Sequence, residues 1–93
     1  MAKHYKREVG TVVTLDCGVD VSAGTTLEIE VEKPDGTLDT WTGAVDGTTG
    51  VKYTLTSSDF DQTGLYKMQA HVTAANGEWF GETVEIYVYD DFE

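Results

Sequence analysis

Residues 27–32 read Leu-Glu-Ile-Glu-Val-Glu, and Lys33-Pro34-Asp35-Gly36 follow directly. The alternation of apolar and acidic side chains has the period of two that marks a half-buried β-strand. Pro-Asp-Gly is a strong turn signal, because proline presets φ and glycine tolerates a positive φ. This stretch therefore predicts a strand with one face toward a core, followed at once by a tight turn.

The same alternation recurs on both sides of this strand. It covers residues 12–17, 38–45, 51–56, 66–73 and 78–89. Asn76-Gly77, between the last two segments, is the strongest two-residue hairpin signal. No window shows a sustained 3.6-residue apolar period, so no helix is expected. The pattern predicts an all-β fold, an antiparallel β-sandwich of about seven strands, with a small closed barrel as the alternative.

The composition restricts the class of protein. The chain has 93 residues and a formal net charge of −11, from six basic and seventeen acidic residues. This length allows one domain. We expect no nucleic-acid partner, because phosphate binding needs a basic face, and no docking onto an anionic membrane. A hydrophobic content of 40% is nevertheless too high for a disordered acidic tail.

The sequence also bears on where the protein is made. It has no run of about 20 apolar residues that would span a membrane. No apolar segment follows the N-terminus, so a signal peptide is not expected. Cys17 is the single cysteine, which excludes an internal disulfide. We therefore expect synthesis in a reducing cytoplasm.

The few positive charges gather at one end of the chain. Half of the six lie within residues 1–7, whereas residues 8–93 contain the other three and all seventeen acidic residues. We expect residues 1–8 to form a basic arm and residues 9–93 to form the domain. The arm residues are candidates for contact with an acidic partner or a second copy of the chain: Lys3, His4, Tyr5, Lys6 and Arg7. Residues 90–93, an acidic tail with one aromatic, are their complement.

No constellation of side chains predicts catalysis. The three glutamates of residues 27–32 are about 7 Å apart along a flat strand face, which offers no cleft to raise a carboxyl pKa. Cys17 is expected to be a small buried hydrophobe, and His4 and His71 lack the spacing of a metal pair. Asp59 and Asp61 faintly resemble a calcium loop but lack its other acidic ligands. We therefore expect a non-enzymatic protein without metal or cofactor.

Aromatic side chains offer a second candidate surface. Trp79 and Phe80 follow the Asn76-Gly77 hairpin, so at least one of them is expected to point outward. Tyr87 and Tyr89 lie on the face opposite Val84, Ile86 and Val88. Exposed aromatics mark binding surfaces, whereas the alternative is packing at the ends of the sandwich. Trp79 and Phe80 are thus candidate partner contacts.

Residues 59–66, Asp-Phe-Asp-Gln-Thr-Gly-Leu-Tyr, resemble the corner before strand F of immunoglobulin-like domains. In that family the tyrosine hydroxyl bonds back to the corner backbone. The resemblance implies this role for Tyr66, the tight turn for Gly64 and the acidic corner position for Asp61. Met68 stands where the family has its second cysteine. The resemblance therefore implies an immunoglobulin-like sandwich without a disulfide.

A longer resemblance covers most of the chain. Residues 10–18, 27–37 and 64–70, with Trp41, look like small phage-encoded immunoglobulin-like proteins. The resemblance implies a structural protein of a phage virion, above all a capsid decoration protein that binds the particle through its arm and sandwich. Its partners would be the major capsid protein or tail proteins, and copies of itself. The alternatives are a tail or baseplate accessory and a module that binds carbohydrate or protein at a cell surface.

Overall fold

The computed structural model describes residues 3–92. The first two residues of the expected arm and Glu93 of the expected tail lie outside this range. Within it all regular structure is β, which confirms the prediction of an all-β sandwich. The strands are β1 (His4–Tyr5), β2 (Val12–Asp16), β3 (Thr26–Glu32), β4 (Leu38–Thr42), β5 (Ala44–Asp46), β6 (Gly50–Thr54), β7 (Gly64–Ala74), β8 (Gly77–Phe80) and β9 (Val84–Tyr89).

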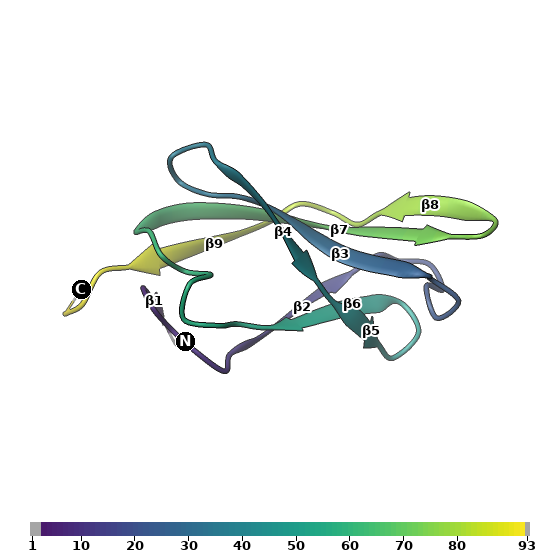
Figure 1. Cartoon of the computed structure of the whole chain (residues 1–93), viewed down its shortest axis with the longest axis horizontal. Coiled ribbons are helices and arrows are strands. Elements are labelled where there is room, and N and C mark those ends of the chain that lie inside the picture. The colour runs from purple at the N-terminus through teal and green to yellow at the C-terminus, as the bar shows by residue number, and fades with distance from the viewer. Residues whose placement is uncertain (1–2, 93) are drawn as a thin grey trace.

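Two sheets form the layers of the sandwich (Figure 1). The larger has the order β1-β9-β7-β3-β4, with β8 paired to the far half of β7. The smaller has the order β2-β6-β5. The molecule measures 46 × 24 × 20 Å, and β1 and β8 lie toward opposite ends of its long axis (Figure 1).

Apolar and polar side chains alternate along the strands, and the apolar ones form the core between the two sheets. Every second residue is buried from Ile29 to Val31 in β3 and from Tyr66 to Val72 in β7, as strand geometry requires when one face meets a core. Trp41 stacks on Tyr53 with ring centroids 4.9 Å apart, and Phe60 lies 5.0 Å from Tyr66. The buried hydrophobic residues are Val13, Leu15, Val21, Ile29, Val31, Trp41, Val51, Leu55, Phe60, Tyr66, Met68, Ala70, Val72 and Val88.

The structure divides the chain into more strands than the seven expected, because two glycines interrupt long segments. At Gly43 the chain leaves β4 in the larger sheet and enters β5 in the smaller one. A Cβ there would lie 2.7 Å from Val51 Cγ1 and 2.9 Å from the carbonyl oxygen of Lys52. At Gly81 the expected strand 78–89 breaks, and a Cβ there would lie 2.8 Å from the carbonyl oxygen of Asp16. Only glycine allows either close approach.

The N-terminal segment belongs to the larger sheet. His4 and Tyr5 pair in parallel with Val88 and Tyr89 of β9. The backbone N–H of Arg7 then donates to the carbonyl of Phe60 at 2.8 Å. The expectation of a wholly antiparallel sandwich is therefore wrong at this edge, where a two-residue strand joins the sheet in the other direction. The described part of the expected arm lies against its own domain.

Candidate partner-binding face

The outer face of the larger sheet is formed by the outward-facing, mostly polar side chains of β3, β4 and β7. Strand register places Glu30 opposite Thr40 of β4 and Gln69 of β7. In the next row it places Glu32 opposite Leu38 of β4 and Lys67 of β7. Three strands that are distant in sequence thus form one continuous surface.

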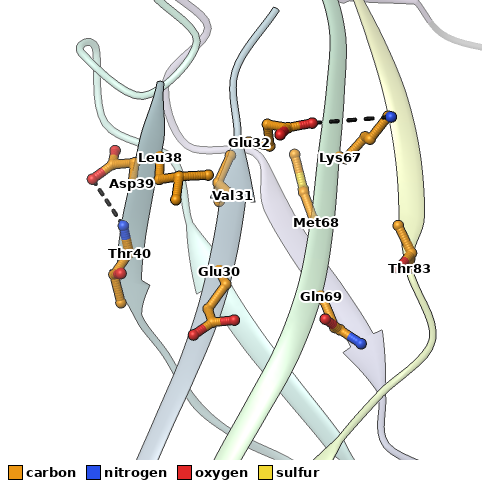
Figure 2. A pocket seen from close by; sticks show the side chains of 10 residues that line it. All are labelled: Glu30, Val31, Glu32, Leu38, Asp39, Thr40, Lys67, Met68, Gln69 and Thr83. Atoms are coloured by element: carbon orange, nitrogen blue, oxygen red, sulfur yellow. Dashed lines mark hydrogen bonds and ion pairs between the residues drawn. The ribbon is translucent and has the colours of Figure 1, made fainter. Parts of the chain in front are cut away.

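These two rows surround a hollow of about 330 Å³, so the expectation of a flat face without a cleft is wrong at Glu30 and Glu32 (Figure 2). Lys67 Nζ lies 3.9 Å from Glu32 Oε1 at one side of it. The backbone of the inward-facing residues contributes the floor, because each lies between two outward-facing neighbours. The lining residues are Glu30, Val31, Glu32, Leu38, Asp39, Thr40, Lys67, Met68, Gln69 and Thr83.

Apolar side chains are exposed along the outer face of the larger sheet, and Leu38 among them lines the hollow. Leu38 is 76% exposed, Phe80 53%, Tyr87 51% and Leu65 41%. Leu65 and Tyr87 are directly opposite each other on β7 and β9, and Phe80 is opposite His71. Single exposed hydrophobic residues are ordinary, whereas several on one sheet face make that face a candidate for contact with a partner.

His71 connects the glutamates of β3 with the β8 hairpin. Its ring stacks on Phe80 with centroids 4.6 Å apart, and its Nε2 lies 2.9 Å from Glu78 Oε2. Its Nδ1 lies 3.5 Å from a carboxylate oxygen of Glu30 and 3.8 Å from one of Glu28. Nδ1 is buried and has no hydrogen-bond partner among the described residues. Three carboxylates therefore converge on one imidazole beside the hollow.

Asp39 protects the free edge of the larger sheet at β4. One of its carboxylate oxygens accepts from the backbone N–H of Thr40 at 2.9 Å, and the other accepts from Trp41 Nε1 at 3.2 Å. Thr40 lies in a row whose N–H points away from β3, so this bond occupies a donor that another strand could use. Charged side chains at a sheet edge prevent edge-to-edge pairing.

We expect Asp39→Ala to raise self-association and to lower the free energy of unfolding by about 1–3 kcal/mol, because Trp41 Nε1 and the Thr40 N–H lose their acceptor. Sedimentation velocity and denaturant titration measure the two effects. Glu82→Ala is the matched control, since it removes the same charge from an exposed residue in the connection between β8 and β9. Equal self-association of the two variants would contradict edge protection by Asp39.

The basic residues predicted as partner contacts bind their own chain. Lys3 Nζ lies 4.7 Å from the centroid of the Tyr89 ring. Lys6 and Arg7 form ion pairs of 3.5 and 2.6 Å with Asp90 and Asp91. The acidic tail predicted as their complement is thus supplied by the same molecule.

His4 and Tyr5 are half-buried beside these charges. His4 Nδ1 lies 3.0 Å from Glu8 Oε2, and the same oxygen accepts from the Thr11 hydroxyl at 2.6 Å. Burial would raise the pKa of Glu8, but the bonds from Thr11, His4 and the backbone of Tyr5 outweigh it and lower the pKa below its ordinary value. This network fixes the N-terminal segment to the sandwich.

Trp79 and Phe80 lie toward the other end of the molecule, on β8 (Figure 1). Trp79 is half-buried and packs against the core, whereas Phe80 points outward. The structure therefore does not bring them together with Lys3–Arg7 into one site. Phe80 instead joins the outer face of the larger sheet.

The corner residues Asp61, Gly64 and Tyr66 lie close together and hold the connection that leads into β7. The Tyr66 hydroxyl accepts from the backbone N–H of Gln62 at 3.0 Å and lies 3.4 Å from Asp61 Oδ1. Burial, above all, raises the pKa of Tyr66. Gly64 has a φ of 126°, where a Cβ would meet the ring of Pro34 at 2.8 Å. Asp61 also pairs with Lys33 at 3.0 Å, so its carboxylate is engaged within the corner.

The other residues considered as catalytic or metal-binding candidates are engaged in contacts that stabilise the fold. Asp59 is buried and accepts from the hydroxyl of Tyr53 and from the N–H and hydroxyl of Thr56. Cys17 is free and half-buried, and burial together with the charge of Asp16 raises its pKa. Among residues 3–92 no group of three or more His, Cys, Asp or Glu side chains is arranged to hold a metal ion.

Sequence reasoning missed Leu38 and Leu65, although a signal for Leu38 exists. Trp41 faces the core, so Leu38, three residues earlier on the same strand, has the opposite parity and must face outward. Residues 3–92 contain no helix that could cross a membrane. No protein-family model matches the chain, and no curated protein is found as a relative.

Proposed function

We propose that this chain is an immunoglobulin-like domain that serves as a structural protein of a phage virion, most specifically as a capsid decoration protein. It is non-enzymatic, and its partners are the major capsid protein or tail proteins, and copies of itself. The observation that carries the proposal is the outer face of the larger sheet, where Leu65 and Tyr87 are exposed side by side, with Leu38 two strands away and Phe80 toward the β8 end of the same face.

Strand order supports the immunoglobulin-like assignment. The smaller sheet, β2-β6-β5, corresponds to strands B, E and D of that family. The series β9-β7-β3-β4 corresponds to G, F, C and C′. Tyr66 lies near the start of β7, the place of strand F, and its hydroxyl bonds back to the corner. The proposed role of this single domain is to bind its partner through the exposed face of the larger sheet.

The ion pairs of Lys6 and Arg7 move the proposed contact from the arm to this face. Both cations already face carboxylates of their own chain, at Asp90 and Asp91. A partner would have to displace those carboxylates, whereas Leu38 and Tyr87 are open to it. The net charge of −11 would help to keep decorated particles apart in solution.

Cosedimentation tests this proposal. Purified chain is mixed with virions of the phage whose genome encodes it, and the bound fraction is measured against concentration. We expect saturable binding, and we expect Leu38→Ser with Tyr87→Ser to weaken it at least tenfold, as loss of buried interface anchors does. Val12→Ser, at an exposed apolar position on the smaller sheet, is the control and should bind normally.

Two results would overturn the proposal. The first is absence of the chain from purified virions together with no cosedimentation. The second is saturable binding to host-cell glycans, through Phe80, without binding to virions, which would assign the chain to recognition of a cell surface.

A further inference from the structure

We infer that the hollow on the outer face of the larger sheet receives an arginine side chain from a basic surface of the protein partner. The inference rests on the proposed function only for the identity of that partner as a virion protein. The chemistry of the occupant follows from the charge, the shape and the rim of the hollow.

The charge of the hollow favours a cationic occupant. Glu28, Glu30 and Glu32 project from one face of β3, about 7 Å apart by strand rise. Among residues 3–92, Lys67 and His71 supply the basic groups of this face, and Lys67 is partnered with Glu32 at 3.9 Å. Glu30 lies in the next row of the hollow, half exposed, with His71 Nδ1 at 3.5 Å but no hydrogen bond from another described residue. The hollow therefore presents one carboxylate that a cation can bind.

Shape is the second argument. A volume of about 330 Å³ is at the lower limit of ligand sites, which are typically about 300–1,000 Å³, so it suits one long side chain. Gln69 is held at the wall by donating to the carbonyl of Gly81 at 2.8 Å. Leu38, with Thr40 beside it, lines the hollow from β4 and supplies an aliphatic wall (Figure 2). An alkyl stem would lie along this wall while its charged head meets Glu30.

The polar groups favour arginine over lysine or a metal ion. Glu30 can accept both parallel N–H groups of a guanidinium, and the amide oxygen of Gln69 lies in the same row. An ammonium ion is more strongly hydrated and lacks this planar match. A hard metal ion needs several converging oxygens, whereas the carboxylates of one strand face are separated. The exposed Leu38 and Tyr87 would contact apolar residues beside the arginine.

The test uses N-acetyl-L-arginine methylamide as the probe and ¹H–¹⁵N NMR of the full chain as the readout. We expect saturable shifts confined to residues of the hollow, and at least fivefold weaker binding of the uncharged citrulline analogue. Glu30→Gln should weaken binding at least fivefold. Asp46→Asn, which removes an equal charge on the smaller sheet, should change it less than twofold. The spectra of both variants also report that the fold is intact.

The inference is overturned if the probe shifts remote acids such as Asp20 and Asp46 as strongly as the hollow, or if Glu30→Gln and Asp46→Asn behave alike. Its failure is distinguishable from that of the proposed function. Virion binding that depends on Leu38 but not on Glu30 would support the proposed function and contradict the inference that the hollow receives an arginine. Arginine binding at the hollow without virion binding would do the reverse.

Discussion

Replacing Phe60 by alanine is expected to lower the free energy of unfolding by about 3–5 kcal/mol. The Phe60 side chain is fully buried, yet it comes from the connection between β6 and β7 and not from a strand. Its ring contacts Tyr66 at 5.0 Å and lies 6.1 Å from both Trp41 and His4. One side chain thus closes the end of the core that the corner, β4 and β1 share.

Denaturant titration measures this loss. A domain of this size has a total stability of about 5–15 kcal/mol, so Phe60→Ala removes a large fraction of it. Phe92→Ala is the matched control, because Phe92 is fully exposed and should change stability by less than about 0.5 kcal/mol. A loss below about 1 kcal/mol for Phe60→Ala would mean that this end of the core is not packed as described.

Asp59→Ala is expected to cost about 2–4 kcal/mol, because one buried carboxylate serves three donors. Asp59 Oδ2 accepts from the Tyr53 hydroxyl at 2.8 Å, the Thr56 N–H at 2.7 Å and the Thr56 hydroxyl at 3.0 Å. The substitution leaves a backbone donor and a phenol without their acceptor. Asp59→Asn keeps one oxygen in place and should cost less than half as much.

The same pair gives a pH signature. Burial, then donation to Asp59 and the charge of that carboxylate, raise the pKa of Tyr53 from 10.0 to about 12. Because the folded pKa is above the unfolded one, the stabilisation is complete below pH 10 and is lost as the pH rises toward 12. Burial also raises the pKa of Tyr66, so phenolate absorbance at 295 nm should show one late-titrating tyrosine fewer in Tyr53→Phe than in the unchanged chain. In Asp59→Asn the pKa of Tyr53 should fall toward 10, and an unchanged titration would contradict the contribution of Asp59.

Much of the fold was predictable because strand parity is a local property. The alternation in residues 27–32 predicted both the strand and the side that faces the core. The inward direction of Ile29 and Val31 could be predicted without knowing which strands pair with them. The breaks at Gly43 and Gly81 were not predictable, because each depends on a backbone carbonyl from a distant strand. The parallel pairing of His4 and Tyr5 with β9 likewise depends on an edge that exists only after folding.

The candidate site was less accessible to sequence reasoning. Charge composition identified the basic segment and the acidic tail, but it could not tell contact within one molecule from contact between two. The hollow needs the registers of β3 with β4 and with β7, which bring Glu30, Thr40 and Gln69 into one row. The hairpin predicted that at least one of Trp79 and Phe80 points outward, and in the structure this is Phe80, whereas Trp79 packs against the core.

The crossing at Gly43 has a consequence for how the molecule opens. β4 and β5 are separated by one residue, yet they belong to different sheets, and the Gly43 N–H still donates to the carbonyl of Leu27 at 2.8 Å. Separating the layers would break this bond or pull one of the two strands from its sheet. The amide protons of the two layers should therefore exchange with solvent through one shared opening event. The crossing at Gly43 thus ties the opening of one layer to the opening of the other.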